Sequence, residues 1–464
     1  MRQLANADTL THNCFGPMTD STIAAIASPP GTGAVSLLRI SGPKACAVVA
    51  KVFRGRSREN WIPRTQHFGE VVDADGGKVD EVLLTWFPGP CSFTGEDVIE
   101  LGCHGGVIVT RQVLEAILCA GAESAEPGEF SRRAFFNGRI DLTQAEAIMD
   151  LISAKTELAA RAAQGQLEGT LGREIEGIRA DLISATAQLE AYIDFPEEDI
   201  TPDTASQLFE RIDKIQGKIT GLLSTADQGK ILREGLKTVI AGAPNAGKSS
   251  LLNLLLGFER AIVNDQAGTT RDTIEEVINL SGIPIRLIDT AGIREGGGEI
   301  EKEGIRRSRH ELELAELVLL VIDSHDSADK LKGIEFDEST RVIRILNKSD
   351  LSRHPDWDGT EGIKVSCVDP SAGEELRELL YREVALDRAI RTTSLTAINS
   401  RHQHCLKKAG EAVKKSRACL DAGQSPEFVA MDLRSALEAV GEVVGKTDVE
   451  EILGEIFSTF CIGK

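Results

Sequence analysis

Aromatic residues are scarce in this chain of 464 residues, since Phe, Trp and Tyr together make up 4% of it. Broad stacking platforms for single-stranded nucleic acid need many such rings, so the composition disfavours that class of protein. Net positive charge is also lacking, because 52 basic against 72 acidic residues leave a formal charge of −20. A protein that coats nucleic acid would be basic, so any RNA contact must be local or shared with a partner.

Long apolar runs and paired cysteines are missing as well. The longest apolar runs, such as residues 317–322, have the length of a strand, whereas a membrane-crossing helix needs about 18 apolar residues. The nine cysteines include no Cys-x-x-Cys pair, and their odd number disfavours a disulfide framework. We therefore expect a cytoplasmic protein with reduced thiols and no membrane contact.

The hydrophobic pattern indicates several regions. Residues 1–17 lack a signal-peptide core and are expected to be a disordered extension, with Met18 as an alternative start. Short strand-like runs in residues 18–140 predict an N-terminal α+β domain. Residues 236–390 alternate strand and helix patterns, which predicts a mostly parallel sheet flanked by helices.

Helical periodicity fills residues 141–235 and returns in residues 391–464. Thr143 and Glu146 are spaced as a capping box at the start of the first helical region. Because the two helical regions flank the α/β region, the simplest architecture is multidomain α/β. In it, an α/β domain is inserted into one all-helical domain.

A phosphate-binding loop is the clearest motif. A strand pattern is followed at once by Gly242-Ala243-Pro244-Asn245-Ala246-Gly247-Lys248-Ser249 and a helical run, the context that confirms a P-loop. Small residues let backbone N–H groups point at phosphate oxygens, Lys248 adds positive charge, and Ser249 offers a hydroxyl to Mg²⁺. The predicted contacts are Asn245, Ala246, Gly247, Lys248, Ser249 and Ser250.

Further motifs follow in the order expected of a Ras-like GTPase. Thr270, in Gly268-Thr269-Thr270, is expected to complete the Mg²⁺ shell, and Asp289-Thr290-Ala291-Gly292 ends a strand near the γ-phosphate. In Asn347-Lys348-Ser349-Asp350, the aspartate can accept hydrogen bonds from the N1–H and 2-amino groups of guanine. Ser366 and Cys367 are expected at guanine O6, although GTPases more often have Ser-Ala-Lys at this place. Together these motifs predict a GTPase.

The residues that would cleave GTP are less regular. Ile293 stands where Ras-like enzymes carry a water-orienting glutamine. Asn245 offers an oxygen to a monovalent cation beside the phosphates, and such a cation would supply the charge of an arginine finger. Glu301 is a candidate for polarising water, and a solvated acidic loop is the alternative interpretation.

The chain also resembles the MnmE (TrmE) family of tRNA modification GTPases from about residue 20 to residue 464. The motifs that carry the resemblance are Thr22-Ile23-Ala24-Ala25, Leu38-Arg39-Ile40-Ser41-Gly42, Phe93-Thr94-Gly95-Glu96-Asp97, Pro127-Gly128-Glu129-Phe130, Leu142-Thr143-Gln144-Ala145-Glu146-Ala147 and Cys461-Ile462-Gly463-Lys464. The resemblance implies a homodimer that joins through its N-terminal domain. It implies G domains that associate when K⁺ and GTP are bound. It further implies a heterotetramer with an FAD-containing MnmG-type partner, which builds a carboxymethylaminomethyl or aminomethyl group at C5 of the tRNA wobble uridine.

The resemblance also assigns residues. It implies that Glu301 orients the attacking water, that Arg294 stabilises the neighbouring switch, and that the Cys461 thiol matters for modification in a role left open. The implied K⁺ ligands are Asn245, Asn264, Gln266 and Thr269. A further loop is expected to bind GTP together with the P-loop. Its residues are Asn264, Asp265, Gln266, Ala267, Gly268, Thr269 and Thr270.

A folate site is implied in the N-terminal domain, for 5-formyl- or 5,10-methylene-tetrahydrofolate. The residues carried over are Arg39, Glu100, Arg139 and Lys464. A carboxylate can accept two hydrogen bonds from the pterin edge, and guanidinium groups suit the glutamate tail. Surface or interface ion pairs are the alternative interpretation of these residues.

RNA contact and rival functions remain open in the sequence. The basic residues of the C-terminal helical region, with two histidines, are Arg401, His402, His404, Lys407, Lys408, Lys414, Lys415 and Arg417. They predict either an RNA-binding helix face or a solvated one. An Era-like ribosome-assembly GTPase switch is the main rival, although no KH-type Gly-x-x-Gly occurs in these helices. A potassium-stimulated GTPase acting on a membrane partner is a second rival, without an anchor to support it.

Overall fold

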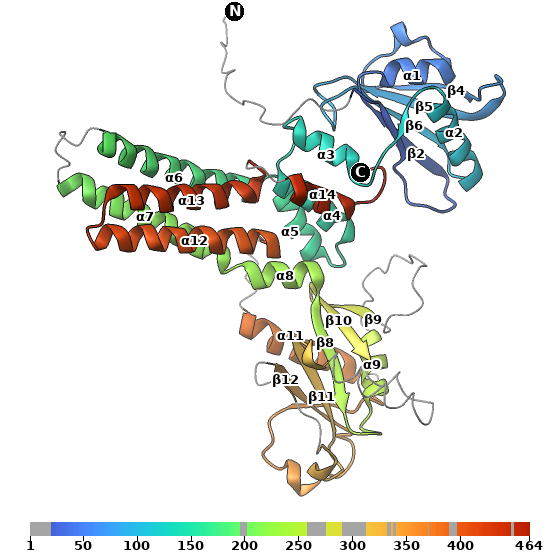
Figure 1. Cartoon of the computed structure of the whole chain (residues 1–464). Coiled ribbons are helices and arrows are strands. Elements are labelled where there is room, and N and C mark those ends of the chain that lie inside the picture. Colours follow the sequence, from blue (N-terminus) through green and yellow to red (C-terminus); the bar gives the residue numbers. More distant parts are fainter. Residues whose placement is uncertain are drawn as a thin grey trace, which may run out of the picture. The chain divides into compact units, whose positions relative to one another are not determined.

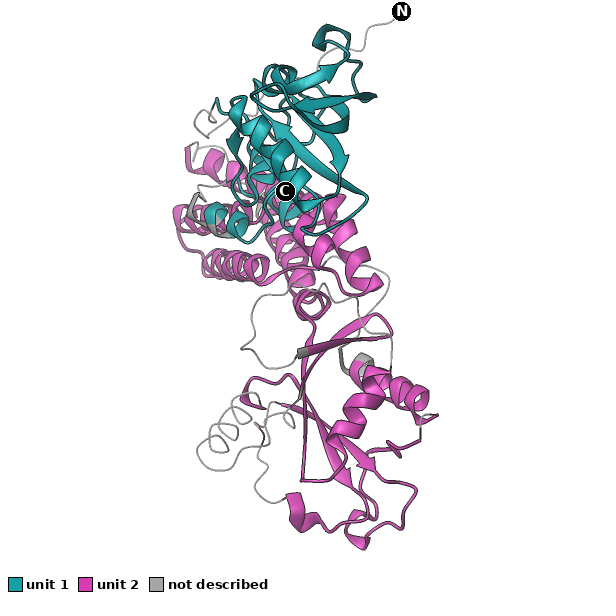
Figure 2. Ribbon diagram, turned by 90° about the vertical axis from the view of Figure 1, so that its right-hand side faces the viewer, with its two compact units in different colours: residues 1–146, 445–464 teal, residues 147–444 magenta. Residues whose placement is uncertain are grey.

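The computed structural model describes residues 20–194, 202–257, 275–289, 312–331, 336, 340–369, 371–388, 397–446 and 450–464. Two compact units divide the chain (Figure 2): the first holds residues 1–146 and 445–464, and the second holds residues 147–444. The predicted extension over residues 1–17 lies outside the described residues. The domain limits at residues 140, 235 and 390 stay predictions, and the multidomain α/β class is confirmed.

The first unit is built on a seven-stranded sheet with the order β3-β4-β5-β6-β2-β1-β7. The strands are β1 (Ile23–Ile26), β2 (Val35–Ser41), β3 (Phe53–Gly55), β4 (Gln66–Val72), β5 (Lys78–Phe87), β6 (Val98–His104) and β7 (Glu123–Ser124). Neighbours pair antiparallel except β1 and β7. A short 3-10 helix η1 (Arg58–Asn60) precedes β4.

Strand alternation gives this sheet two different faces. Leu38, Leu84 and Leu101 point to one face and form a core with α1 (Ala45–Val52) and α2 (Val107–Cys119). The opposite face, here called the open face, carries Arg39 and Glu100, which are register partners on β2 and β6. The sheet thereby places two residues that are 61 positions apart directly opposite each other.

Three helices complete the first unit or its boundary: α3 (Glu129–Phe136), α14 (Glu450–Ser458) and α4 (Leu142–Ser153), which crosses the limit between the units. The expected capping box is displaced by two residues. Asp141 Oδ1 accepts the Gln144 backbone N–H at 2.9 Å, and Gln144 Oε1 accepts that of Asp141 at 3.0 Å. The first helical residue is Leu142, so Thr143 already lies inside the helix and cannot cap it.

The second unit contains a helical bundle in which α6, α7, α12 and α13 run side by side (Figure 1). Their bounds are α6 (Thr170–Asp194), α7 (Pro202–Leu223), α12 (Ser400–Asp421) and α13 (Pro426–Val444), with α5 (Glu157–Leu167) and α8 (Ala226–Glu234) beside them. Apolar residues at helical spacing from all four helices form one core. Because two of these helices precede the α/β domain and two follow it, the predicted insertion is confirmed.

The inserted domain has a sheet whose described strands follow the order β13-β12-β11-β8-β10-β9. They are β8 (Leu236–Gly242), β9 (Glu275–Leu280), β10 (Ile283–Asp289), β11 (Leu317–Asp323), β12 (Arg341–Asn347) and β13 (Ile363–Lys364). Only β9 runs antiparallel among them. The helical segments are α9 (Lys248–Leu256), α11 (Ala372–Arg388), η2 (Ala328–Leu331) and η3 (Pro355–Trp357).

This strand order decides where a ligand binds. The central strand β8 has β10 on one side and β11 on the other, which makes its carboxyl end a topological switch point. The P-loop follows β8 there, and Asp289, Asp323 and Asn347 end the neighbouring strands at the same edge. The predicted motifs therefore converge although they are far apart in sequence.

Candidate functional site

The P-loop turns tightly between β8 and α9. Gly242, Asn245 and Gly247 all have positive φ angles, of 151°, 61° and 99°. The buried ammonium of Lys248 donates to the carbonyl oxygens of Gly242 at 3.0 Å and Ala243 at 2.8 Å. The loop thus wraps around its own lysine, as expected of a phosphate-binding loop. Asn245 is exposed.

Asn347 joins this loop to the opposite side of the site. Its side-chain N–H donates to the Ala246 carbonyl oxygen at 2.8 Å, and its side-chain oxygen accepts the backbone N–H of Cys367 at 3.0 Å. The side chain is buried, so both of its polar ends are satisfied by loops from separate strands. The predicted base-recognition loops and the predicted phosphate loop are therefore one connected structure.

Asp350 lies exposed at the base side of the site. A hydrogen bond from Ser366 is the main cause that lowers the pKa of the Asp350 carboxyl below its usual range. The Ser349 N–H donates to the Val365 carbonyl oxygen at 3.2 Å, which ties the two loops together through the backbone as well. Burial raises the pKa of the Cys367 thiol to about 11. An ionised carboxylate at this place suits the paired donors of guanine.

Several predicted site residues lie in parts of the chain that the structure does not describe. Outside the described residues lie Asn264, Asp265, Gln266, Ala267, Gly268, Thr269, Thr270, Thr290, Ala291, Gly292, Arg294 and Glu301. Asp289 ends β10 as expected, and Ser249 is exposed in the first turn of α9, where a Mg²⁺ ion beside the phosphates would meet its hydroxyl. The described residues contain no group of three or more His, Cys, Asp and Glu arranged for a metal.

Arg39 and Glu100 form the centre of a second site on the open face. The Arg39 Nε and Nη2 atoms lie 3.0 and 2.8 Å from Glu100 Oε1. The guanidinium carbon of Arg39 lies 5.2 Å from the ring centroid of Phe93 and 5.9 Å from that of Phe130. Sequence reasoning missed both rings, although each occurs inside a motif that carried the resemblance.

Lys464 reaches the same place from the other end of the chain. Burial, and then the positive charge of Arg39, lower the pKa of the Lys464 ammonium below its usual range. The backbone oxygen of Lys464 accepts the Phe130 N–H at 3.2 Å, and Ile462 bridges to Pro127. The structure thus brings Arg39, Glu100 and Lys464 together. The family resemblance implied this grouping, whereas no periodic pattern in the sequence connects the C-terminal tail to β2 and β6.

Cys461 and Arg139 lie at the edges of this second site. The Cys461 thiol is exposed, while its backbone oxygen accepts the Gly128 N–H at 3.5 Å and that of Lys464 at 3.3 Å. Arg139 is exposed and donates to the Ser92 carbonyl oxygen at 3.1 Å, one residue before Phe93. The tail that presents the thiol is therefore held by backbone hydrogen bonds.

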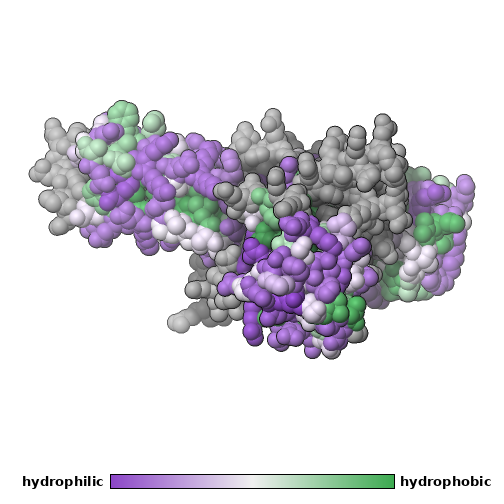
Figure 3. All heavy atoms as spheres, turned by 90° about the horizontal axis from the view of Figure 1, so that it is seen from below, coloured by the Kyte–Doolittle hydropathy of each residue, from purple (hydrophilic) through white to green (hydrophobic). Residues whose placement is uncertain are grey.

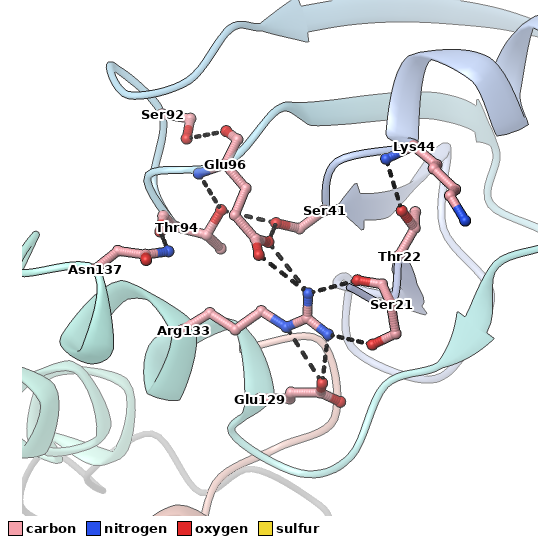
Figure 4. A network of polar contacts seen from close by, with 10 residues as sticks. All are labelled: Ser21, Thr22, Ser41, Lys44, Ser92, Thr94, Glu96, Glu129, Arg133 and Asn137. Atoms are coloured by element: carbon pink, nitrogen blue, oxygen red, sulfur yellow. Dashed lines mark hydrogen bonds and ion pairs between the residues drawn. The ribbon is translucent and has the colours of Figure 1, made fainter. Parts of the chain in front are cut away.

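A buried arginine connects the segments that carry the second site (Figure 4). Arg133, on α3, is 2% exposed and donates to Glu129 at 2.8 Å, to Glu96 at 3.2 Å and to the backbone oxygen of Ser21 at 2.8 Å. Glu96 also accepts the Ser41 hydroxyl at 2.6 Å. These bonds join α3, β2 and the loop that carries Phe93. They thereby hold in place the segments that carry Phe93 and Phe130 beside Arg39.

Fewer of the basic residues of α12 are available for RNA than the sequence suggested, because several are buried or already paired. His402 is fully buried and belongs to a capping box with Asn399. Arg401 donates to backbone oxygens of α13, and Lys408 pairs with Glu442 at 2.9 Å. Arg417 pairs with Asp213 and Asp421. The remaining exposed lysines of this region are Lys407, Lys414 and Lys415.

The strand order, the P-loop and the connected base-recognition loops define a Ras-like P-loop GTPase. A family model described as the MnmE helical domain matches residues 142–461, and one described as the N-terminus of the GTP-binding protein TrmE matches residues 22–139. The chain belongs to this family of tRNA modification GTPases, MnmE.

Relatives match over almost the full length. The tRNA modification GTPase MnmE of Akkermansia muciniphila is 48% identical over 451 residues, which cover 96% of this chain and 100% of the relative. That of Clostridioides difficile is 43% identical and covers 96% of this chain and 99% of the relative. Among solved structures, the G domain of the T. maritima FeoB iron transporter is 28% identical and covers 33% of this chain and 98% of that one. Its TM-score is 0.22.

None of the described helices is both long and apolar enough to cross a bilayer. The described residues visible in Figure 3 are mostly hydrophilic, and the hydrophobic ones among them lie in small separate patches.

Proposed function

We propose that this chain hydrolyses GTP to drive a modification of tRNA, at C5 of the wobble uridine. The observation that carries the nucleotide part is Asn347, whose side chain connects the P-loop to the loop that contains Cys367. This connection supports one site for phosphates and base together. The names of the family's relatives support tRNA as the target.

In this proposal a K⁺ ion beside the phosphates stabilises the charge that develops during hydrolysis. The exposed Asn245, held at a φ of 61° in the P-loop, supports its role as a ligand of that ion. Ser249 holds Mg²⁺ with Thr270, and Glu301 orients the attacking water. K⁺ should stimulate hydrolysis over Na⁺, and Asn245→Ala should remove that stimulation. An equal rate in both salts would overturn the K⁺ assignment.

The second site binds a tetrahydrofolate in this proposal. Its donor and acceptor set supports a pterin: the Glu100 carboxylate faces the 2-amino-4-oxo edge, while the partly exposed ring of Phe93 supplies aromatic surface and the fully buried Phe130 packs behind Arg39. Lys464, Arg39 and Arg139 supply positive charge for the glutamate tail. The exposed Cys461 thiol stands next to this site, which supports a role close to the one-carbon unit.

Dimerisation through the first unit is part of the same proposal. Phe68, Leu83 and Val35 lie on the open face and are 65%, 42% and 68% exposed. Phe68 and Leu83 are register partners on β4 and β5, so they form a continuous apolar surface across the strands. An apolar surface beside the folate site supports pairing with a second copy of this chain. An FAD-containing MnmG-type protein is the further partner.

RNA contact is assigned to the exposed lysines of α12. Lys407 and Lys414 are seven residues apart and so share a helix face. Lys415 directly follows Lys414. Phosphates bind such a face through charge, which makes the contact sensitive to salt.

Mass spectrometry of tRNA nucleosides tests the modification proposal. A strain that lacks this protein should lose carboxymethylaminomethyl-type wobble uridines. Cys461→Ser and Glu301→Ala should not restore them, whereas Cys91→Ser, which changes another exposed thiol, should. Normal wobble uridines in the deletion strain would favour the rival, an Era-like assembly switch.

A further inference from the structure

One ion pair beside the base-recognition loop is not accounted for by the motifs. Asp323 is the last residue of β11, and its Oδ2 atom lies 2.6 Å from the Nζ atom of Lys348. The Asp323 side chain is 9% exposed, whereas that of Lys348 is 36% exposed. A nearly buried carboxylate thus holds the head of a partly exposed lysine.

The backbone at this place is constrained as well. Lys348 has a φ of 59°, a conformation that residues with side chains rarely adopt. Asp323 is the register partner of Asn347 on β12, and the buried hydroxyl of Ser324 donates to the Asn347 carbonyl oxygen at 2.7 Å. The Ser324 N–H donates to the same oxygen at 3.1 Å. The end of β11 therefore holds Asn347 through hydrogen bonds from Ser324 and Lys348 through its ion pair with Asp323.

The two nearby carboxylates, Asp326 and Asp350, each have a hydrogen-bond donor other than Lys348. Lys330 pairs with Asp326 at 2.6 Å, three residues beyond Asp323. The Asp350 carboxylate has its own hydrogen bond from Ser366. After the hydrogen bonds from Lys330 and Ser366, the charge of Lys348 also lowers the pKa of Asp326 and of Asp350, but its ammonium forms its ion pair with Asp323.

We propose that Asp323 is a positioning residue for guanine nucleotides and acts through Lys348. The inference rests on the assignment of residues 347–350 as the base-recognition loop. Lys348 stands between Asn347, which reaches the P-loop, and Asp350, which recognises the base edge. Its aliphatic stem can cover the flat face of the base while its ammonium stays with Asp323. A lysine held in this way loses less rotamer freedom on binding, so the site is preorganised.

Equilibrium binding of GDP to the full chain tests this inference. Asp323→Asn should weaken GDP binding about tenfold and raise the KM for GTP, with kcat changed less than about twofold, because the cleaved phosphate lies away from Lys348. Asp326→Asn is the matched control, since it removes an Asp–Lys pair of the same length in the segment that follows β11. It should leave GDP affinity unchanged. An unchanged affinity in Asp323→Asn would overturn the inference.

A double-mutant cycle separates positioning from a merely structural role. In a Lys348→Met background, Asp323→Asn should cause no further loss of GDP affinity, because its effect passes through the lysine. An equal tenfold loss in that background would overturn the inference. Failure of the unaltered chain to bind GDP would instead overturn the proposed nucleotide site itself, so the two failures are distinguishable.

Discussion

A Cβ atom on Gly247 would lie 2.1 Å from the Nδ2 atom of Asn347, far inside van der Waals contact. Asn347 cannot retreat without losing its bonds to Ala246 and Cys367. Position 247 therefore requires glycine for two reasons. Its φ is positive, and the Asn347 side chain leaves no space for a Cβ atom.

Gly247→Ala should abolish nucleotide binding. The methyl group would displace the Asn347 side chain, and the left-handed backbone would add strain of about 1–3 kcal/mol. We expect GDP affinity to fall at least about a hundredfold, or about 2.7 kcal/mol. Fluorescent GDP titration measures the loss. Gly257→Ala, at the end of the same helix, should bind GDP normally because that residue has a helical φ of −69°.

Asp350→Asn should change the base that the site accepts. The carboxylate accepts from two guanine donors, whereas an amide would donate to the 2-oxo group of xanthine. The KM for GTP should rise at least about tenfold, and that for XTP should fall, as measured by phosphate release. Unchanged preference for GTP would contradict the assignment of Asp350 to the base.

The pH dependence of GDP binding follows from the same carboxyl. Hydrogen bonding from Ser366 lowers the Asp350 pKa, so the carboxylate stays ionised as the pH falls and protonates only below the usual Asp range. The terminal phosphate of GDP titrates at about pH 6 in every variant, so the measure is the ratio of GDP affinities of the unaltered chain and Asp350→Asn, which should stay level from about pH 8 to pH 5. Isothermal titration calorimetry of both proteins across this range checks it. A ratio that falls steadily between about pH 7 and pH 5 would assign recognition to a group of higher pKa.

Arg133→Ala should destabilise the first unit strongly. It would leave Glu96 and Glu129 without their buried partner, which typically costs about 3–5 kcal/mol. Arg132→Ala removes only a partly exposed pair with Glu126 and should cost less than about 1 kcal/mol.

Tryptophan fluorescence in urea can measure both variants. Trp61 and Trp86 lie in the first unit, and the third tryptophan of the chain, Trp357, lies in the second. A Trp357→Phe background therefore confines the signal to the first unit. Equal midpoints for Arg132→Ala and Arg133→Ala would contradict the role of the buried network.

Thiol reactivity should divide the cysteines by burial. Burial is the main cause that raises the pKa of Cys46 and of Cys405 to about 11, so at pH 8 on the order of one thiol in a thousand is ionised. Iodoacetamide should modify the exposed Cys91, Cys119 and Cys461 of the native chain first. Mass spectrometry of the digested protein resolves the sites. Early modification of Cys405 would show that the bundle opens.

The nucleotide site could be predicted in some detail because its motifs are local. The P-loop lies within eight consecutive residues, and its curl depends on small residues next to each other in sequence. The strand ends that bear Asp289 and Asn347 are marked by short apolar runs. Asp323 ends a strand in the same way, but its significance depends on Lys348, which the pattern does not connect to it.

The charges of α12 show where sequence reasoning stops. Lys407 and Lys408 are adjacent and chemically identical, yet only Lys408 lies within reach of Glu442 on α13. Arg417 likewise finds Asp213, 204 residues away. Helical spacing predicts which side chains share a face, but the neighbouring helix decides which of them are neutralised.

The amino-acid sequence by itself determined the chemistry of the phosphate loop, the base-recognition loops and the order of strands and helices, because these depend on neighbours within a few residues. Tertiary structure decided that Arg39 meets Glu100 across β2 and β6, that Lys464 joins them, and that Arg133 is buried between Glu96 and Glu129. Those contacts join segments separated by tens to hundreds of residues. Their formation depends on sheet register and on packing, which place distant side chains together where no periodic pattern connects them.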